Sequence, residues 1–263
     1  MLPIVGAMQL LIPPADLAVP ALVTALAAFL AGLARGFSGF GAAMVFVPPV
    51  AAVVGPVVAM PVLLLADVVT SSPLIARAFK ACSWQDVRRV SLGALVGLPA
   101  GNHILTSTDP LIVRWTVTAL IALSLAVMLA RIEWRAPQTR GAAAGVGLVS
   151  GLMSGLAQIG GPPVVMYWLA AKIEPGRIRA NLIAYFALLM WGGLAIFLLK
   201  GLVTPRVVWL AAAAAPGYAA GMLVGSRMFG LARPETFRLV SIGLVALATV
   251  LGMPALDGLL RAR

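Results

Sequence analysis

Charged residues are scarce in this chain. They make up 10% of its 263 residues, whereas hydrophobic residues make up 62%. Both values lie far from those of an ordinary globular domain, and such a chain cannot cover itself with a polar surface in water. Its apolar stretches of about 18 residues or more are long enough to cross a hydrocarbon core roughly 30 Å thick. The sequence therefore predicts a membrane protein.

Cysteine and histidine occur once each, at Cys82 and His103. A single cysteine forms no intrachain disulfide, and this pair of residues is too small a set for a metal site. The chain also lacks the Gly-x-Ser-x-Gly elbow of many hydrolases and the Walker loop of ATPases. We therefore expect no enzyme activity, no metal or other cofactor, and no transport driven by ATP. His103 is expected at a helix end near the membrane interface.

The apolar segments lack the alternation of barrel strands, so they are predicted to be helices. The predicted fold class is an all-α polytopic membrane protein with two inverted repeats. Each repeat is a broken, re-entrant helical hairpin followed by three transmembrane helices. The expected division places the first repeat at residues 1–135 and the inverted second repeat at residues 136–263.

Two halves of the chain share this layout. Each begins with an apolar segment that is broken by glycines, over residues 19–54 and 141–171. Three further helices are predicted after each hairpin, at 57–79, 90–105 and 111–129, then at 180–199, 207–225 and 239–251. The second helix of each set carries Gly-x3-Gly, at Gly97/Gly101 and Gly217/Gly221. These glycines are predicted to permit close helix packing.

The net charge of +11 comes largely from short basic stretches. Thirteen of the nineteen Lys and Arg residues lie at 77–89, 131–140, 172–179 and 227–238. Short basic loops stay on the cytoplasmic side, so this pattern reflects topology and argues against nucleic acid as a partner. The second broken segment is flanked by two such stretches and should enter from the cytoplasm and return there. By the same rule, the first hairpin faces the outside.

The glycine-rich breaks predict a binding site. Glycine lets the chain leave the helix and brings backbone N–H groups close to a ligand. Non-helical backbone at membrane depth is tolerated where it lines a cavity. Half-helices that start after Gly41 and at Pro162 would direct positive dipole ends at an anion. The alternative is that these glycines only allow close packing of helices.

Arg35 and Asp67 are the charged residues expected deep in the membrane, at similar depths. Charges there are costly and indicate function. Asp67 is interpreted as a counter-ion or proton carrier for Arg35; the alternative is a permanent structural ion pair. The candidate substrate-binding residues are Arg35, Gly36, Ser38, Gly39, Phe40, Gly41, Gln158, Ile159, Gly160 and Gly161.

Four polar residues outside this set are given a structural interpretation. Thr70 and Ser71 are expected to bond to carbonyls of their own helix. Arg179 and Asn181 are expected at a solvated loop end.

Two motifs resemble those of the TauE/SafE sulfite exporters, also called the toluene-sulfonate uptake permease family. The first is Ala31-Gly-Leu-Ala-Arg-Gly-Phe-Ser-Gly-Phe-Gly41 followed by Val47-Pro48, and the second is Gly151-Leu-Met-Ser-Gly-Leu-Ala-Gln-Ile-Gly-Gly-Pro-Pro163. The resemblance covers the chain from about Leu17. It implies a carrier of sulfite, sulfonates and related anions in the bacterial inner membrane.

The expected function is a secondary-active transporter of small sulfur-containing anions, sulfite or organosulfonates, that exports them by alternating access at the two hairpin tips. A proton-coupled importer of organic anions and a passive anion channel are the alternatives. The expected partners are a small anionic substrate and the lipid bilayer. Homo-oligomerisation and the direction of transport stay open.

Overall fold

The computed structural model describes residues 18–129, 137–171 and 173–228, together with single positions between 243 and 256. Within these residues the fold is all-α, with ten α-helices, one short 3-10 helix and no strand. The predicted fold class is confirmed in this respect. The N-terminal segment around Pro13 and nearly all of the helix expected at 239–251 lie outside the described residues.

Two broken hairpins form where the glycine motifs lie. The first consists of α2 (Ala18–Ser38) and α3 (Ala42–Val54), and the second of α8 (Arg140–Ala157) and α9 (Gly161–Ala170). At the first break Gly39 and Gly41 have φ values of 80° and 86°, a left-handed conformation that costs glycine no Cβ clash. At the second break Gln158 adopts φ 57°. The predicted breaks in both helices are therefore confirmed.

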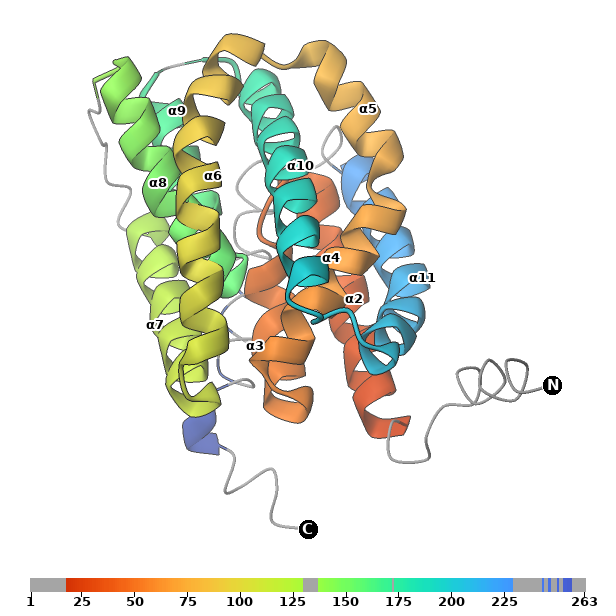
Figure 1. Ribbon diagram of the computed structural model, residues 1–263. Coiled ribbons are helices and arrows are strands. Elements are labelled where there is room, and N and C mark those ends of the chain that lie inside the picture. Colours follow the sequence, from red (N-terminus) through yellow and green to blue (C-terminus); the bar gives the residue numbers. More distant parts are fainter. Residues whose placement is uncertain are drawn as a thin grey trace, which may run out of the picture.

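The two hairpins enter the bundle from opposite ends (Figure 1). The start of α2 and the α3–α4 connection lie at the lower end of the view, whereas α8 starts and α9 finishes at the upper end. The basic α5–α6 connection lies at the same end as the second hairpin. That the two hairpins face opposite sides of the membrane stays a prediction.

The helix expected at 57–79 is not continuous, and this expectation was wrong. The structure has α4 (Pro56–Thr70) and α5 (Ser72–Ala81), bent by 70° at Ser71. Pro73 explains the bend, because it has no N–H to continue the hydrogen bonding of α4 and it disfavours helical geometry at the preceding residue. The bend leaves Asp67 within the last turn of α4.

Four longer helices complete the described bundle: α6 (Trp84–Ser107), α7 (Pro110–Leu129), α10 (Pro175–Leu199) and α11 (Pro205–Met228). Of the described residues, four helices are long and apolar enough to cross a membrane, and the bent pair α4–α5 makes a fifth candidate span. These are α2, α7, α10 and α11, judged by length and composition. The chain is a multi-pass membrane protein.

Glycines hold two helix pairs in close backbone contact. Helix α2 packs on α11, and α6 packs on α8. A Cβ at Gly97 would collide with the carbonyl oxygen of Leu148, and a Cβ at Gly221 with that of Phe29. The predicted packing role of these glycines is confirmed, as is the general use of small residues at such contacts.

The two helix pairs make matching contacts. Gly36 lies against Met222 in the first pair as Gly155 lies against Leu98 in the second. Similarly, Gly32 faces the carbonyl of Tyr218, and Gly151 faces that of Ala94. In each pair, a hairpin helix of one half of the chain packs on a helix of the other half.

These contacts correct the register between the halves. Gly97 contacts Leu148 and Gly221 contacts Phe29 at matching places, and the next pair is Gly101 with Gly225. The Gly-x3-Gly motif at Gly97/Gly101 therefore corresponds to Gly221/Gly225, one helical turn later than the motif chosen from the sequence.

Substitution of Gly151 by alanine should destabilise the protein, because the new Cβ would collide with the Ala94 carbonyl. Overpacking of this kind costs about 1–3 kcal/mol. The Gly145→Ala variant is a matched control in the same helix, since nothing lies within 4 Å of the added Cβ. We expect a lower melting temperature in detergent for Gly151→Ala alone. Equal melting temperatures for the two variants would contradict the close-contact role.

Candidate functional site

A cavity lies between the two hairpin tips and is walled by α4 and α10. Its volume is about 80 Å³, which is room for a few water molecules or one small anion at roughly 10–15 Å³ for each water-sized site. The wall is mostly apolar. Its polar and charged members are Arg35, Asp67, Asn102, Ser154, Gln158 and Tyr218.

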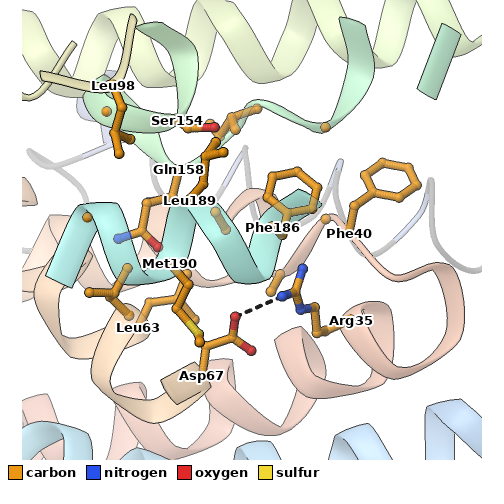
Figure 2. Close-up of a pocket in the computed structure, with 18 of the residues that line it drawn as sticks. Arg35, Phe40, Leu63, Asp67, Leu98, Ser154, Gln158, Phe186, Leu189 and Met190 are labelled. Atoms are coloured by element: carbon orange, nitrogen blue, oxygen red, sulfur yellow. Dashed lines mark hydrogen bonds and ion pairs between the residues drawn. The ribbon is translucent and has the colours of Figure 1, made fainter. Parts of the chain in front are cut away.

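The centre of the site is an ion pair between Arg35 of α2 and Asp67 of α4 (Figure 2). Arg35 Nη2 lies 3.0 Å from Asp67 Oδ2, and the Arg35 side chain is 5% exposed. The expectation that these residues lie at matching depths is consistent with this contact. Removing two charges from water is costly, and their attraction offsets that cost only when further hydrogen bonds complete the site.

Asp67 receives hydrogen bonds from a third helix and from the α4–α5 bend. The Tyr218 hydroxyl of α11 donates to Asp67 Oδ1 at 2.9 Å, and the Ser71 hydroxyl at the α4–α5 bend donates to the same oxygen. Together with Arg35, all three partners are donors, and an ionised carboxylate is an acceptor only. These contacts suit the carboxylate form of Asp67.

The Arg35 guanidinium contacts both the first tip and α10. Nη1 donates to the Gly39 carbonyl at 2.9 Å, and the guanidinium carbon lies 5.3 Å from the centre of the Phe186 ring. Such a distance is within the range of a cation–π interaction. Arg35 Nε is buried and has no hydrogen-bond partner among the described residues. The guanidinium therefore retains donors that a bound anion can use.

The first hairpin tip contributes residues to the cavity unevenly. Phe40 and Gly41 line it with Arg35. Gly39 contributes its carbonyl to Arg35, and the Ser38 hydroxyl bonds to the carbonyls of Ala34 and Phe40. Of the predicted residues of this tip, Gly36 instead packs against α11, with its Cα facing the Met222 carbonyl.

At the second tip, Gln158, Ile159 and Gly161 line the cavity. The Gln158 side chain also donates from Nε2 to the Met60 carbonyl of α4 at 2.6 Å. Gly160 lies in close contact with Ser154 and Ser150, where a Cβ would not fit. Thus the predicted residues of the second tip meet those of the first around one cavity.

The two half-helices differ in what they offer an anion. Helix α3 begins at Ala42, and although the Met44 N–H donates to the Gly41 carbonyl, the N–H groups of Ala42 and Ala43 precede the first hydrogen bond of the helix. Helix α9 has Pro162 and Pro163 in its first turn, and proline has no N–H. The α3 end is therefore the richer source of donors, although both ends carry the positive side of a helix dipole.

Arg179 and Asn181 are not at a solvated loop end, and that expectation was wrong. Both lie in the first turns of α10, which pack inside the bundle. Arg179 Nε donates to the Phe37 carbonyl at 2.8 Å, so it caps the end of α2. Asn181 is fully buried and accepts a hydrogen bond from the Ser83 N–H. Thr70, in contrast, bonds to the Ala66 carbonyl of its own helix as expected. The same expectation for Ser71 was wrong, because its hydroxyl donates to the Asp67 carboxylate instead.

Sequence reasoning missed Tyr218, Phe186, Asn102 and Ser154 as cavity residues. Two of these had a signal in the sequence: Ser154 lies in the second glycine motif directly before Gly155, and Tyr218 lies directly after Gly217 in a glycine-rich helix. The positions of the others depend on how α6, α8 and α10 pack. A sequence pattern does not report such packing.

Long apolar helices, two broken hairpins and a buried charged cavity define a multi-pass α-helical membrane protein. Comparison with protein families matches residues 24–252 to the family described as "Sulfite exporter TauE/SafE". This match spans most of the chain, which therefore belongs to the TauE/SafE sulfite exporter family of membrane transporters. No curated protein and no solved structure matches the chain.

Removal of one member of the Arg35–Asp67 pair should destabilise the protein strongly. Asp67→Asn leaves a buried guanidinium without its countercharge, a change that typically costs about 3–5 kcal/mol. The double variant Arg35→Met/Asp67→Leu should lose less free energy of unfolding than the sum of the losses in Arg35→Met alone and Asp67→Leu alone. A double-mutant cycle of melting in detergent measures this difference.

The control is Asp86→Asn, which removes a half-exposed pair with Arg89 at 4.0 Å. Exposed pairs of this kind contribute little to stability. Additive losses at Arg35 and Asp67 would show that the two side chains do not depend on each other.

Proposed function

We propose that this protein is a secondary-active carrier of small sulfur-containing anions, sulfite or organosulfonates, and that it exports them by alternating access at the two hairpin tips. The observation that carries the proposal is the cavity itself. Tips that enter from opposite ends of the bundle meet at one small cavity, and that cavity contains a buried arginine. Broken helices that meet in this way are typical of secondary transporters.

Arg35 and the start of α3 would bind the anion. A guanidinium presents several N–H donors, and its hydrogen bonds to an oxyanion are stronger than neutral ones. The first-turn N–H groups after Gly41 line the same cavity and carry the positive end of the α3 dipole. Backbone donors and a fixed cation together favour an oxyanion of small size.

Asp67 would regulate the charge of Arg35. With Asp67 ionised, the pair is neutral, so an anion gains less from Arg35 than it would from a free guanidinium. Withdrawal or protonation of the carboxylate frees the arginine to bind. Such a change would couple anion binding to a proton or to the movement of α4, because the carboxylate is held by residues of α2, α4–α5 and α11.

The repeat architecture supports alternating access. The matching α2–α11 and α6–α8 contacts are consistent with an inverted repeat at residues 1–135 and 136–263. Two related halves of this kind can exchange conformations, which would open the cavity first to one side and then to the other. By the positive-inside rule, the basic connections support a second hairpin that would face the cytoplasm, in a bacterial inner membrane.

Counterflow of labelled sulfite in proteoliposomes tests the proposal. Wild-type protein should show saturable exchange, and Arg35→Gln should abolish it when exchange is measured below the lowered melting temperature of the variant. Arg206→Gln removes an exposed arginine at the start of α11 and serves as the matched control. Competing taurine, sulfoacetate, sulfate and acetate rank the substrates. Conductance without saturation or counterflow would instead identify a channel.

Asp67→Asn should change the pH dependence of net transport more than that of exchange. In exchange the carrier returns with a substrate bound, so Asp67 does not have to release its proton separately, whereas in net transport the carrier returns empty. Initial rates across a pH series, measured for both modes in the same liposomes, provide the test. Identical profiles for wild type and variant would exclude Asp67 as the proton carrier and leave it as a fixed counter-ion.

A further inference from the structure

The cavity has two sides with corresponding backbone contacts but different charge. The first hairpin and α4 form the charged half of the cavity, and the second hairpin with α6 and α10 forms the neutral half. Arg35 directly precedes Gly36, and Ser154 directly precedes Gly155, the glycine that makes the matching helix contact. In the same way, Asp67 and Phe186 lie at the same distance from the prolines that begin α4 and α10. The charged pair in one half therefore corresponds to a neutral serine and a phenylalanine in the other.

A second set of contacts supports this register between α4 and α10. The Met60 carbonyl of α4 accepts the hydrogen bond from Gln158, the residue in the second tip that corresponds to Gly39. The Arg179 carbonyl of α10 lies 3.3 Å from a Cβ placed on Gly39. The two tips thus contact matching carbonyls, which supports the correspondence of Arg35 with Ser154 and of Asp67 with Phe186.

The neutral half contains polar atoms without partners. Ser154 Oγ and Asn102 Oδ1 are buried and have no hydrogen-bond partner among the described residues, yet both residues line the cavity. Ser154 is 7% exposed and Asn102 is 2% exposed. A buried polar group without a partner costs about 1–3 kcal/mol, so a bound group that satisfies it gains that energy.

Apolar side chains separate the charged half from the neutral one. Figure 2 shows Arg35 and Asp67 on one side of the cavity and Ser154 on the other, with Gln158 and the apolar residues Phe186, Leu189 and Met190 between them. Water is a poor occupant of an apolar wall, whereas a short carbon chain fits it. A compact inorganic oxyanion held at Arg35 would leave the far polar groups unsatisfied.

We propose that Ser154 and Asn102 form a neutral subsite for the far end of the substrate, and that the preferred substrate is a short organic oxyanion with a hydroxyl or amino group at its other end. The oxyanion binds at Arg35, the carbon chain lies against the apolar wall, and the terminal group hydrogen-bonds to Ser154 and Asn102. This inference rests on the proposed carrier function and names its substrate class.

Two probes of nearly equal shape test the subsite. In 2-hydroxyethanesulfonate a hydroxyl takes the place of the terminal methyl group of 1-propanesulfonate. Competition against labelled sulfite counterflow should favour the hydroxyl compound by about tenfold or more in the wild type, since a lost buried hydrogen bond of 1.4 kcal/mol or more gives that ratio. Ser154→Ala and Asn102→Leu should each reduce the preference severalfold, measured as the ratio of the two inhibition constants within each variant.

Ser91→Ala is the matched control. Ser91 is also a buried residue of α6, and its hydroxyl has no hydrogen-bond partner among the described residues, but it does not line the cavity. Loss of this hydroxyl should leave the preference for 2-hydroxyethanesulfonate unchanged. A wild type that does not distinguish the probes, or variants that keep the full preference, would overturn the subsite while sulfite exchange still upheld the carrier.

Ligand-dependent melting in detergent separates the subsite from transport. A bound ligand raises the melting temperature according to its affinity, whether or not it is transported. A larger shift with 2-hydroxyethanesulfonate than with 1-propanesulfonate, lost in Ser154→Ala, supports the subsite even where counterflow fails. Absence of both counterflow and any difference in melting would reject the carrier and the subsite together.

Discussion

The buried pair of Arg35 and Asp67 sets the constraint on which the rest of the structure depends. Two charges in an apolar interior are tolerated only when the surrounding groups satisfy their hydrogen bonds. Here the partners come from four places: the Gly39 carbonyl at the first tip, Ser71 at the α4–α5 bend, Tyr218 of α11 and the Phe186 ring of α10. Each of these elements is therefore placed in part by one ion pair.

Glycine is what lets those elements come close enough. The α2–α11 contact brings the Tyr218 backbone against Gly32, and this contact places the Tyr218 hydroxyl within reach of Asp67. The α6–α8 contact brings Asn102 against Gly155 and so places it in the cavity wall. Without side chains at these points, dispersion contacts between backbones become the main attraction between helices in lipid. The same glycines thus determine both the close helix packing and the positions of the cavity residues.

The two corresponding halves of the cavity present different chemical groups, so the two ends of the cavity are not equivalent. A symmetric backbone alone would present the same chemistry to both ends of a ligand, but here one half has Arg35 and the other has Ser154. Under the proposed alternating-access mechanism, a ligand with two different ends would bind in one orientation, and the same half would lead on every cycle of opening. The neutral half also lowers the number of charges that the protein must bury, since a second ion pair would add a further desolvation cost.

The amino-acid sequence by itself determined the membrane class, the helical fold, the two breaks and the pairing of Arg35 with Asp67. Each of these depends on local properties: apolar length, the conformational freedom of glycine, and the cost of a charge in lipid. Tertiary structure alone decided the one-turn shift between the glycine motifs and the roles of Asn102, Ser154 and Phe186. Those features depend on which helix faces look toward each other, and composition and spacing carry no direct record of that choice.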